Sequence, residues 1–135
     1  MTTRGERNFN PGNIRHGSPW VGLAATQNDP SFCTFISPEY GIRAIAVILA
    51  SYKAKGIDSL RATINRWAPP SENETDAYVH DVSSQTGLDP DTCIDLTAFT
   101  TCKALVKAII YHENGEQPYS DETITKGLSL AGIQP

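Results

Sequence analysis

The segment around residues 37–55 constrains the fold most, because it carries the local signals of a long helix. Ser37 is a good N-cap, and Pro38 suits the first helical position, where a backbone N–H has no helical partner. Glu39 places a negative charge at the positive end of the helix dipole. Apolar side chains then recur at helical spacing until "KAKG": Ile42, Ile45, Ala46, Leu49 and Tyr52. The segment therefore predicts an amphipathic helix.

Two shorter helices are predicted after this one. The first is capped by Asp58 or Ser59 and stops before a Pro-Pro pair, which cannot continue a helix. The second starts near Asn73 or Thr75, and Gly87 ends it in the manner of a helix C-terminal glycine.

The long apolar pattern from about residue 98 to residue 112 predicts a further helix, and a short last helix begins at Ser120 or Asp121. The long helix has a strongly apolar set of side chains: Leu105, Val106, Ala108, Ile109 and Ile110. Internal repeats and linkers are absent from the sequence. With 135 residues, the chain is expected to form one domain.

The N-terminal region follows different rules. Residues 4–22 are rich in Gly, Asn and Pro and are predicted to form loops and turns. "SFCTFI" (31–36) alternates polar and apolar residues, which predicts a short strand, with "WVGLAA" (20–25) as a candidate hairpin partner. We therefore expect a mainly α (α+β) fold over residues 1–135: a single compact helical domain with a small β or loop lobe near the N-terminus.

Composition narrows the classes of partner. The net charge is −4, so a broad basic face for nucleic acid is not expected. No run approaches the ~20 apolar residues of a membrane-spanning helix, and membrane insertion is not expected. The N-terminal charges are not followed by an apolar segment, so no secretory signal is predicted. We expect synthesis in the cytoplasm and another route to any target outside it.

The three cysteines give no sign of a metal site. Cys33 stands in an apolar run and is expected to be a small buried hydrophobe. Cys93 and Cys102 could form a local disulfide in an oxidising compartment, and this alternative stays open. There is no CxxC pair and no HExxH sequence, so neither zinc nor any other cofactor is predicted.

Glu113 is the first candidate for chemistry. It lies at the C-terminal end of the apolar helix, where the negative end of the helix dipole is expected to raise the pKa of a carboxyl group. Partial burial against Tyr111 or Ile110 would raise this pKa further. A carboxylic acid that stays protonated near neutral pH can protonate a leaving oxygen. The alternative is a polar helix end that faces water before Asn114-Gly115.

Two other glutamates have simpler explanations. Glu6 lies in a Gly-Glu-Arg-Asn loop with an arginine on either side, which favours its ionised form and suits a base or a surface ion pair. Glu39 is explained by its place in the first turn of a helix.

A polar loop with an aromatic side chain is the candidate binding site. Asn8, Asn10 and Asn13 are followed by Trp20. Amide groups offer hydrogen bonds to hydroxyl and acetamide groups, and an indole ring offers a stacking face to a sugar. The alternative is that the asparagines only satisfy backbone groups in turns.

The order of these pieces resembles the lysozyme-like superfamily, above all lytic transglycosylases and related phage peptidoglycan hydrolases. "RGERNFNPGNIRHGSPWVG" followed by "FISPEYGIRAIAVILASY" is similar to the opening of a group of phage and prophage proteins, and to the Asn-x-x-Gly-Ile-Lys turn of bacterial glucosaminidases. "ENETDAYVHDV" resembles the Glu-Thr-x-x-Tyr-Val-x-x-Val helix of transglycosylases. There a tyrosine lies over the catalytic acid, a role that the resemblance gives to Tyr78.

The chain departs from that family in the position of its acid. Transglycosylases carry the catalytic glutamate on a helix before these motifs, and only five residues precede Glu6 here. "LVKAIIYHENG" looks like the missing helix, but it lies near the C-terminus. We therefore expect a circular rearrangement, which is physically reasonable because chain ends often lie close together. On this hypothesis Glu113 is the acid, and the asparagine-rich loop lies across the cleft from it.

The resemblance implies a peptidoglycan muramidase of phage or prophage type, which cleaves the β-1,4 bond between N-acetylmuramic acid and N-acetylglucosamine. Glu113 would be the acid, and Glu6, then Glu72, the candidate second carboxylate. The side chains expected to hold the glycan are Asn10, Asn13, Trp20 and Tyr78, beside Glu72.

The type of reaction, a non-catalytic role and the route of delivery stay open at this point. Without a second carboxylate within ~10 Å, one acid would perform both proton transfers, as in a lytic transglycosylase that leaves an anhydro sugar. The alternative from another class is a non-catalytic virion or tail protein that binds glycan, with other virion proteins as partners. A secreted antibacterial effector would use the same chemistry. Delivery to the wall would follow release, virion entry or secretion.

Overall fold

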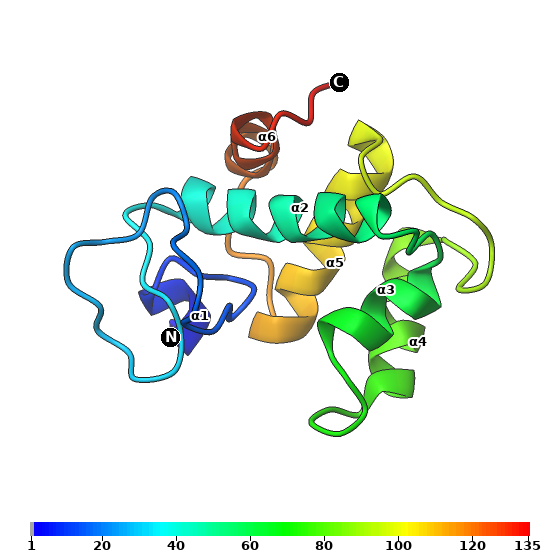
Figure 1. Ribbon diagram of the computed structural model, residues 1–135, viewed down its shortest axis with the longest axis horizontal. Coiled ribbons are helices and arrows are strands. Elements are labelled where there is room, and N and C mark those ends of the chain that lie inside the picture. The colour runs from blue at the N-terminus through cyan, green and yellow to red at the C-terminus, as the bar shows by residue number, and fades with distance from the viewer. Residues whose placement is uncertain (1) are drawn as a thin grey trace.

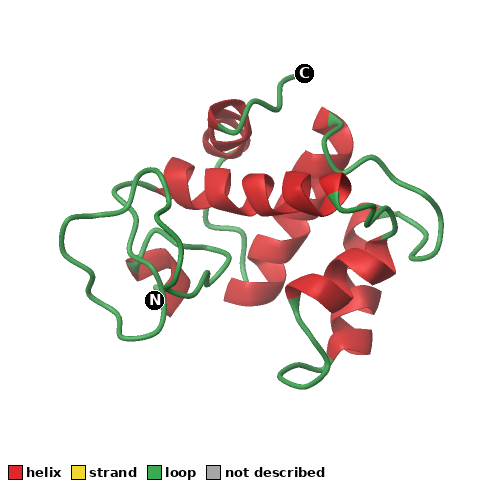
Figure 2. Ribbon diagram, viewed as in Figure 1, coloured by secondary structure: helices red, strands yellow, loops and turns green. Residues whose placement is uncertain are grey.

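The computed structural model describes residues 2–135, and over these residues the chain is mainly helical (Figures 1 and 2). The helices are α1 (Arg4–Arg7), α2 (Pro38–Ala54), α3 (Leu60–Trp67), α4 (Thr75–Thr86), α5 (Phe99–Asn114) and α6 (Asp121–Leu130). The expected mainly α fold is confirmed.

Helix α2 runs through the middle of the molecule, with α6 on one side and α5 on another (Figure 1). Its apolar residues Ile42, Ile45 and Leu49 are fully buried, as their helical spacing predicts. Gly127 of α6 lies so close to Ile42 that a Cβ atom at position 127 would collide with that side chain. The close approach of α2 and α6 therefore depends on this glycine.

Helices α3, α4 and α5 form the other half of the helical region. α4 packs against both α3 and α5. The α5 side chains Leu105, Val106, Ile109 and Ile110 are fully buried. α5 continues to Asn114, two residues beyond its predicted end, and stops at Gly115, which has a left-handed backbone with φ 72°. Glu113 is consequently in the last turn of the helix.

The N-terminal lobe, residues 2–36, differs from its prediction in two ways. Residues 4–7 form a one-turn helix rather than a loop, because Thr3 and Glu6 make a capping box: Glu6 N–H donates to the Thr3 hydroxyl at 3.2 Å, and Thr3 N–H donates to the Glu6 carboxylate at 3.3 Å. Phe9 and Asn13, with φ near 50°, turn the chain after it.

The predicted strand at 31–36 is the second correction, since the described residues contain only isolated bridges here. Leu23, which lies on the predicted hairpin partner, pairs with Phe35, but Phe32 pairs with Arg15 outside that segment. The N–H of Thr34 donates to the Gln27 side chain at 2.7 Å, and the N–H of Phe35 donates to the Asn8 carbonyl at 2.9 Å. Because successive backbone groups bond to different segments, a continuous ladder does not form.

The cysteines do not support the alternative of a disulfide. Cys33, Cys93 and Cys102 are all free in the described part of the chain, so a bond between Cys93 and Cys102 is not formed. Cys102 is fully buried on α5, whereas Cys93 is exposed, forms an antiparallel bridge with Ser59 and has its sulfur 3.6 Å from Asp58. The expected burial of Cys33 is confirmed. Within residues 2–135 no helix combines the length and hydropathy needed to cross a membrane.

Candidate active site

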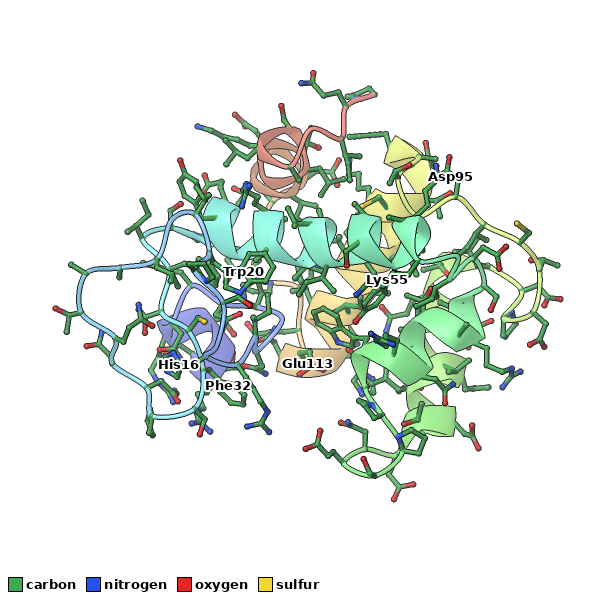
Figure 3. The ribbon with its side chains drawn as sticks, in the orientation of Figure 1. His16, Trp20, Phe32, Lys55, Asp95 and Glu113 are labelled. Atoms are coloured by element: carbon green, nitrogen blue, oxygen red, sulfur yellow. The ribbon has the colours of Figure 1, made fainter. Side chains whose placement is uncertain are left out.

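The Glu113 carboxylate connects three parts of the chain that are distant in sequence. Its Oε1 atom accepts a hydrogen bond from Asn13 Nδ2 at 3.1 Å, and its Oε2 atom accepts one from the Tyr78 hydroxyl at 2.9 Å. Figure 3 shows Glu113 between the N-terminal lobe, where Phe32 is labelled, and helix α3. The two donors fix the orientation of the carboxyl group.

Tyr78 is held firmly beneath this carboxylate. Its hydroxyl accepts a hydrogen bond from Trp67 Nε1 at 3.1 Å, and its ring stacks on His112 with 3.6 Å between centroids. The side chain is almost completely buried. Burial raises the pKa of the Tyr78 hydroxyl, and the negative charge of Glu113 raises this pKa further. Tyr78 therefore stays protonated and acts as a hydrogen-bond donor to Glu113.

The loop that carries Asn13 is fixed by a buried amide. Asn10 is fully buried; its Oδ1 atom accepts from Ile14 N–H at 3.0 Å, and its Nδ2 atom donates to the carbonyls of Ile14 and Cys33 at 2.9 Å. These bonds hold residues 10–14 in a tight turn, with Asn13 in the left-handed region. The side chain of Asn13 is thereby directed toward the end of α5.

Asn114 ties the same loop to α5 from the other side. Its Nδ2 atom donates to the Pro11 carbonyl at 2.9 Å and to the Ile110 carbonyl at 2.8 Å, and its Oδ1 atom accepts from the Thr3 hydroxyl at 2.6 Å. The last turn of α5 and the N-terminal lobe are thus connected on both sides of Glu113. The position of the carboxylate relative to Asn13 is consequently part of the fold.

A cleft of about 200 Å³ opens over Glu113. One wall is formed by the N-terminal lobe and the other by the end of α3 with the loop that follows it. The residues that line it are Gly12, Asn13, Arg15, Phe32, Trp67, Ala68, Pro69, Glu72, Asn73 and Glu113. The lining is predominantly polar, with two aromatic rings, which suits a hydrophilic ligand that also has flat faces.

Several of the predicted site residues come together here. Glu113, Asn13 and Glu72 line the cleft, and Tyr78 donates to Glu113 from below. The predicted proximity of Tyr78 and of the asparagine-rich loop to Glu113 is confirmed. The catalytic and binding roles of these residues stay predictions.

Three other predicted residues do not reach the cleft. The Glu6 carboxylate accepts a hydrogen bond from the Thr3 N–H, so this side chain serves the start of α1 and does not line the cleft. Asn10 is fully buried and bonds only to backbone groups, which was the alternative reading of this loop. Trp20 packs against the core beside α2 rather than beside Glu113 (Figure 3). Neither Asn10 nor Trp20 is placed to hold a ligand in this cleft.

Four residues of the site were not predicted. Trp67 and Phe32 supply aromatic surface, Arg15 supplies a positive charge, and His112 stacks on Tyr78. His112 also lies 3.3 Å from Asp81 through Nδ1. Trp67 could have been identified from the sequence, because it comes directly before "APP", where a short helix ends and a loop begins. Arg15 and Phe32 gain their roles only through the pairing of two distant loop segments.

Across residues 2–135, no group of three or more His, Cys, Asp or Glu side chains is arranged to hold a metal ion.

No protein-family model matches the chain. Over 130 residues the chain is 40% identical to Protein P5 of Pseudoalteromonas phage PM2, in an alignment that covers 93% of this chain and 79% of the phage protein.

The chain belongs to the family of phage PM2 Protein P5. The name Protein P5 states no activity, so the chemistry must be argued from the cleft.

Proposed function

We propose that the protein cleaves the glycan strands of peptidoglycan at the β-1,4 bond between N-acetylmuramic acid and N-acetylglucosamine. The observation that supports this most is the Glu113 carboxyl group, which is held by Asn13 and Tyr78 at the base of a polar cleft with aromatic walls. Glycosidases protonate the leaving oxygen with a positioned carboxylic acid, and most of them have a second carboxylate in the same cleft.

In the proposed reaction Glu113 transfers its proton to the glycosidic oxygen. The bond from the anomeric carbon to that oxygen breaks, and positive charge develops on the sugar ring. Asn13 and Tyr78 keep the carboxyl group in one orientation, so that little reorganisation is needed when the proton moves. The Trp67 N–H holds the Tyr78 hydroxyl in its turn.

The second half of the reaction has two forms. Glu72, which replaces Glu6 as the candidate second carboxylate, lines the same cleft and could activate water. Alternatively the glycan's own 6-hydroxyl attacks the anomeric carbon and returns its proton to Glu113, which gives the anhydro sugar of a lytic transglycosylase. The end group of the product distinguishes these two forms.

We also propose that the helical domain is a circularly rearranged lysozyme-like fold. Helix α1 packs against α5, and Asn114 bonds to the Pro11 carbonyl and the Thr3 hydroxyl. The acid-bearing helix near the C-terminus is therefore directly beside the N-terminal segment. This is the arrangement expected if the break in the chain had moved from before the acid helix to after it.

The chain belongs to a family of phage proteins, and a second candidate function is that of a virion component that binds glycan without cutting it. The two functions differ in what Glu113→Gln removes. An enzyme would lose clearing of a cell-wall suspension by a factor of roughly 10²–10⁴, while its fold and its binding to the wall remain. A binding protein would show no clearing before or after the change.

The matched control is Glu116→Gln, which neutralises an exposed glutamate three residues further along. This control variant is expected to clear the suspension at the wild-type rate. Clearing that persists in Glu113→Gln would rule out Glu113 as the acid.

A further inference from the structure

Two arginines lie over the same ring in the N-terminal lobe, and they differ in their partners. The guanidinium of Arg4 is 4.4 Å and that of Arg15 is 5.2 Å from the centre of Phe32. Arg4 forms a two-pronged ion pair with Asp29, from Nε at 2.5 Å and from Nη2 at 2.6 Å. The charge of Arg4 is therefore already neutralised within the lobe.

Arg15 has no such partner. Within residues 2–135 its guanidinium makes neither an ion pair nor a hydrogen bond with another side chain or carbonyl, and the residue is exposed. Its backbone is nevertheless fixed, because Arg15 and Phe32 form an antiparallel bridge and His16 N–H donates to the Ser31 carbonyl at 3.2 Å. Arg15 and Phe32 both line the cleft that contains Glu113. A free positive charge is thus held on one wall of this cleft.

The charges of the cleft are divided between its walls. Arg15 lies on the wall of the N-terminal lobe, Glu72 on the opposite loop, and Glu113 at the base. A guanidinium that stacks on a ring keeps its N–H edge free, and this edge matches the two oxygens of a carboxylate. A neutral sugar polymer would leave this group unused.

We infer that Arg15, stacked on Phe32, binds a carboxylate of the substrate and makes the cleft selective for acidic glycan strands over neutral ones. The inference rests on the proposed function, because it takes peptidoglycan to be the ligand of the cleft. Two groups of peptidoglycan have this chemistry: the lactyl carboxylate of muramic acid, which is free only where the stem peptide has been removed, and the carboxylates of the stem peptide itself.

Binding to soluble glycan strands tests the inference independently of cleavage. Glu113→Gln serves as the background, so that strands are not consumed, and Arg15→Gln is added to it. Three probes are compared by calorimetry: peptide-bearing strands, strands stripped of peptide by an amidase, and peptide-bearing strands whose carboxylates have been converted to methylamides. Arg43→Gln, on α2 beside α6, is the control for loss of one arginine charge.

The expected result is that Arg15→Gln weakens binding to at least one of the two acidic probes about tenfold. The loss should shrink at high salt, and the methylamide probe should bind both proteins equally. Loss on stripped strands assigns Arg15 to the lactyl carboxylate, and loss only on peptide-bearing strands assigns it to the stem peptide. Arg43→Gln should change nothing.

Equal affinities of the Arg15→Gln and parent proteins for both acidic probes would overturn the inference, as would an equal loss on the methylamide probe or the absence of any binding. The proposed function is judged separately, by cleavage with Glu113 intact. If the protein cleaves the wall but Arg15→Gln does not change binding, the proposed enzyme stands and the anion site is ruled out. If Arg15→Gln weakens binding but the protein does not cleave, the anion site belongs to a binding protein.

Discussion

The helical region and the N-terminal lobe are held together by different forces. Helices α2–α6 bury a continuous apolar core, in which Ile45, Leu105 and Ile109 have no exposed surface. The lobe of residues 2–36 contributes a few apolar side chains to this core, but it also buries the polar side chains of Asn8, Asn10 and Thr34. Apolar packing depends on area and tolerates small shifts, whereas buried amides depend on the direction of each hydrogen bond.

The candidate site lies where these two regions meet. Glu113 comes from the helical region and Asn13 from the polar lobe, and the bond between them crosses the boundary. The helical region therefore gives the Glu113 carboxyl group a stable support, while the lobe supplies a hydrogen-bond donor of fixed direction. The two regions should consequently respond differently to single substitutions.

The largest effect is expected from Ile109→Ala in the helical region. Ile109 is fully buried on α5, and its loss leaves a cavity in the shared core. We expect the free energy of unfolding to fall by about 2–5 kcal/mol, measured by urea denaturation followed by circular dichroism. Leu130→Ala, at a partly exposed position, is the control and should cost less than ~1 kcal/mol. Equal losses for the two variants would contradict the idea of one packed core.

A smaller and more local effect is expected from Asn10→Ala. The change leaves the Ile14 N–H and the Cys33 carbonyl without the amide that bonds them. We expect a cost of about 2–3 kcal/mol, confined to the lobe. Hydrogen exchange followed by mass spectrometry should show faster exchange in residues 13–35 and unchanged exchange in α5.

The control for this variant is Asn65→Ala, whose exposed amide only donates to the Arg61 carbonyl on the same helix. It should leave exchange in the lobe unchanged. If Asn10→Ala instead accelerated exchange equally in α5, the lobe and the helical region would form one cooperative unit, and the contrast between them would be wrong.

The smallest effect concerns acid pH and the ion pair of the lobe. The Arg4 guanidinium holds the pKa of Asp29 well below its usual range, and the N–H groups of Ser31 and Phe32 contribute to the same shift. Because the pKa of Asp29 is lower in the folded state, its contribution to stability is complete above the unfolded value of ~3.9 and is lost as the pH falls below it. The protection of residues 28–33 against hydrogen exchange, relative to the intrinsic exchange rate at each pH, should therefore fall between about pH 4 and pH 2.5.

Asp29→Asn provides the comparison for this pH effect. It removes the titrating group, so the lobe of the variant should be less stable than wild type at pH 6 and should change less between pH 4 and pH 2.5. A variant whose pH profile parallels that of the wild-type protein would show that Asp29 is not responsible.

The same contrast explains how much of the structure could be predicted from sequence. The helical region was predicted well because its signals are local: Ser59 and Ser120 cap α3 and α6 as expected, and Gly87 ends α4. The exact end of α5 was missed by two residues, since Asn114 is held in place by bonds to Pro11 and Thr3, about 100 residues away in sequence.

The lobe was predicted poorly for the opposite reason. Polar and apolar residues do alternate at 31–36. However, side chains such as that of Gln27 bond to the backbone groups that a partner strand would use. The start of α1 does have a local signal, since Thr3-Arg4-Gly5-Glu6 fits the capping-box pattern.

The site was predictable in part. Glu113 and Tyr78 followed from the helix pattern and the family resemblance, and Asn13 from its amide-rich loop. Arg15 and Phe32 were not predicted, because only the pairing of residues 15 and 32 brings them to the cleft. Glu6 was misjudged because its neighbouring arginines alone do not separate a helix cap from a group that faces a ligand; the capping-box pattern with Thr3 does.

The most direct test of the central claim is mass analysis of the fragments that the purified protein releases from isolated cell wall. If Glu113 is a general acid, the wild-type and Glu116→Gln proteins release disaccharide-peptides cut between muramic acid and glucosamine, and Glu113→Gln releases none. An anhydro end on these fragments would identify a lytic transglycosylase, and a reducing end a hydrolase. An undegraded wall with the wild-type protein, or the same fragments with Glu113→Gln, would contradict the claim.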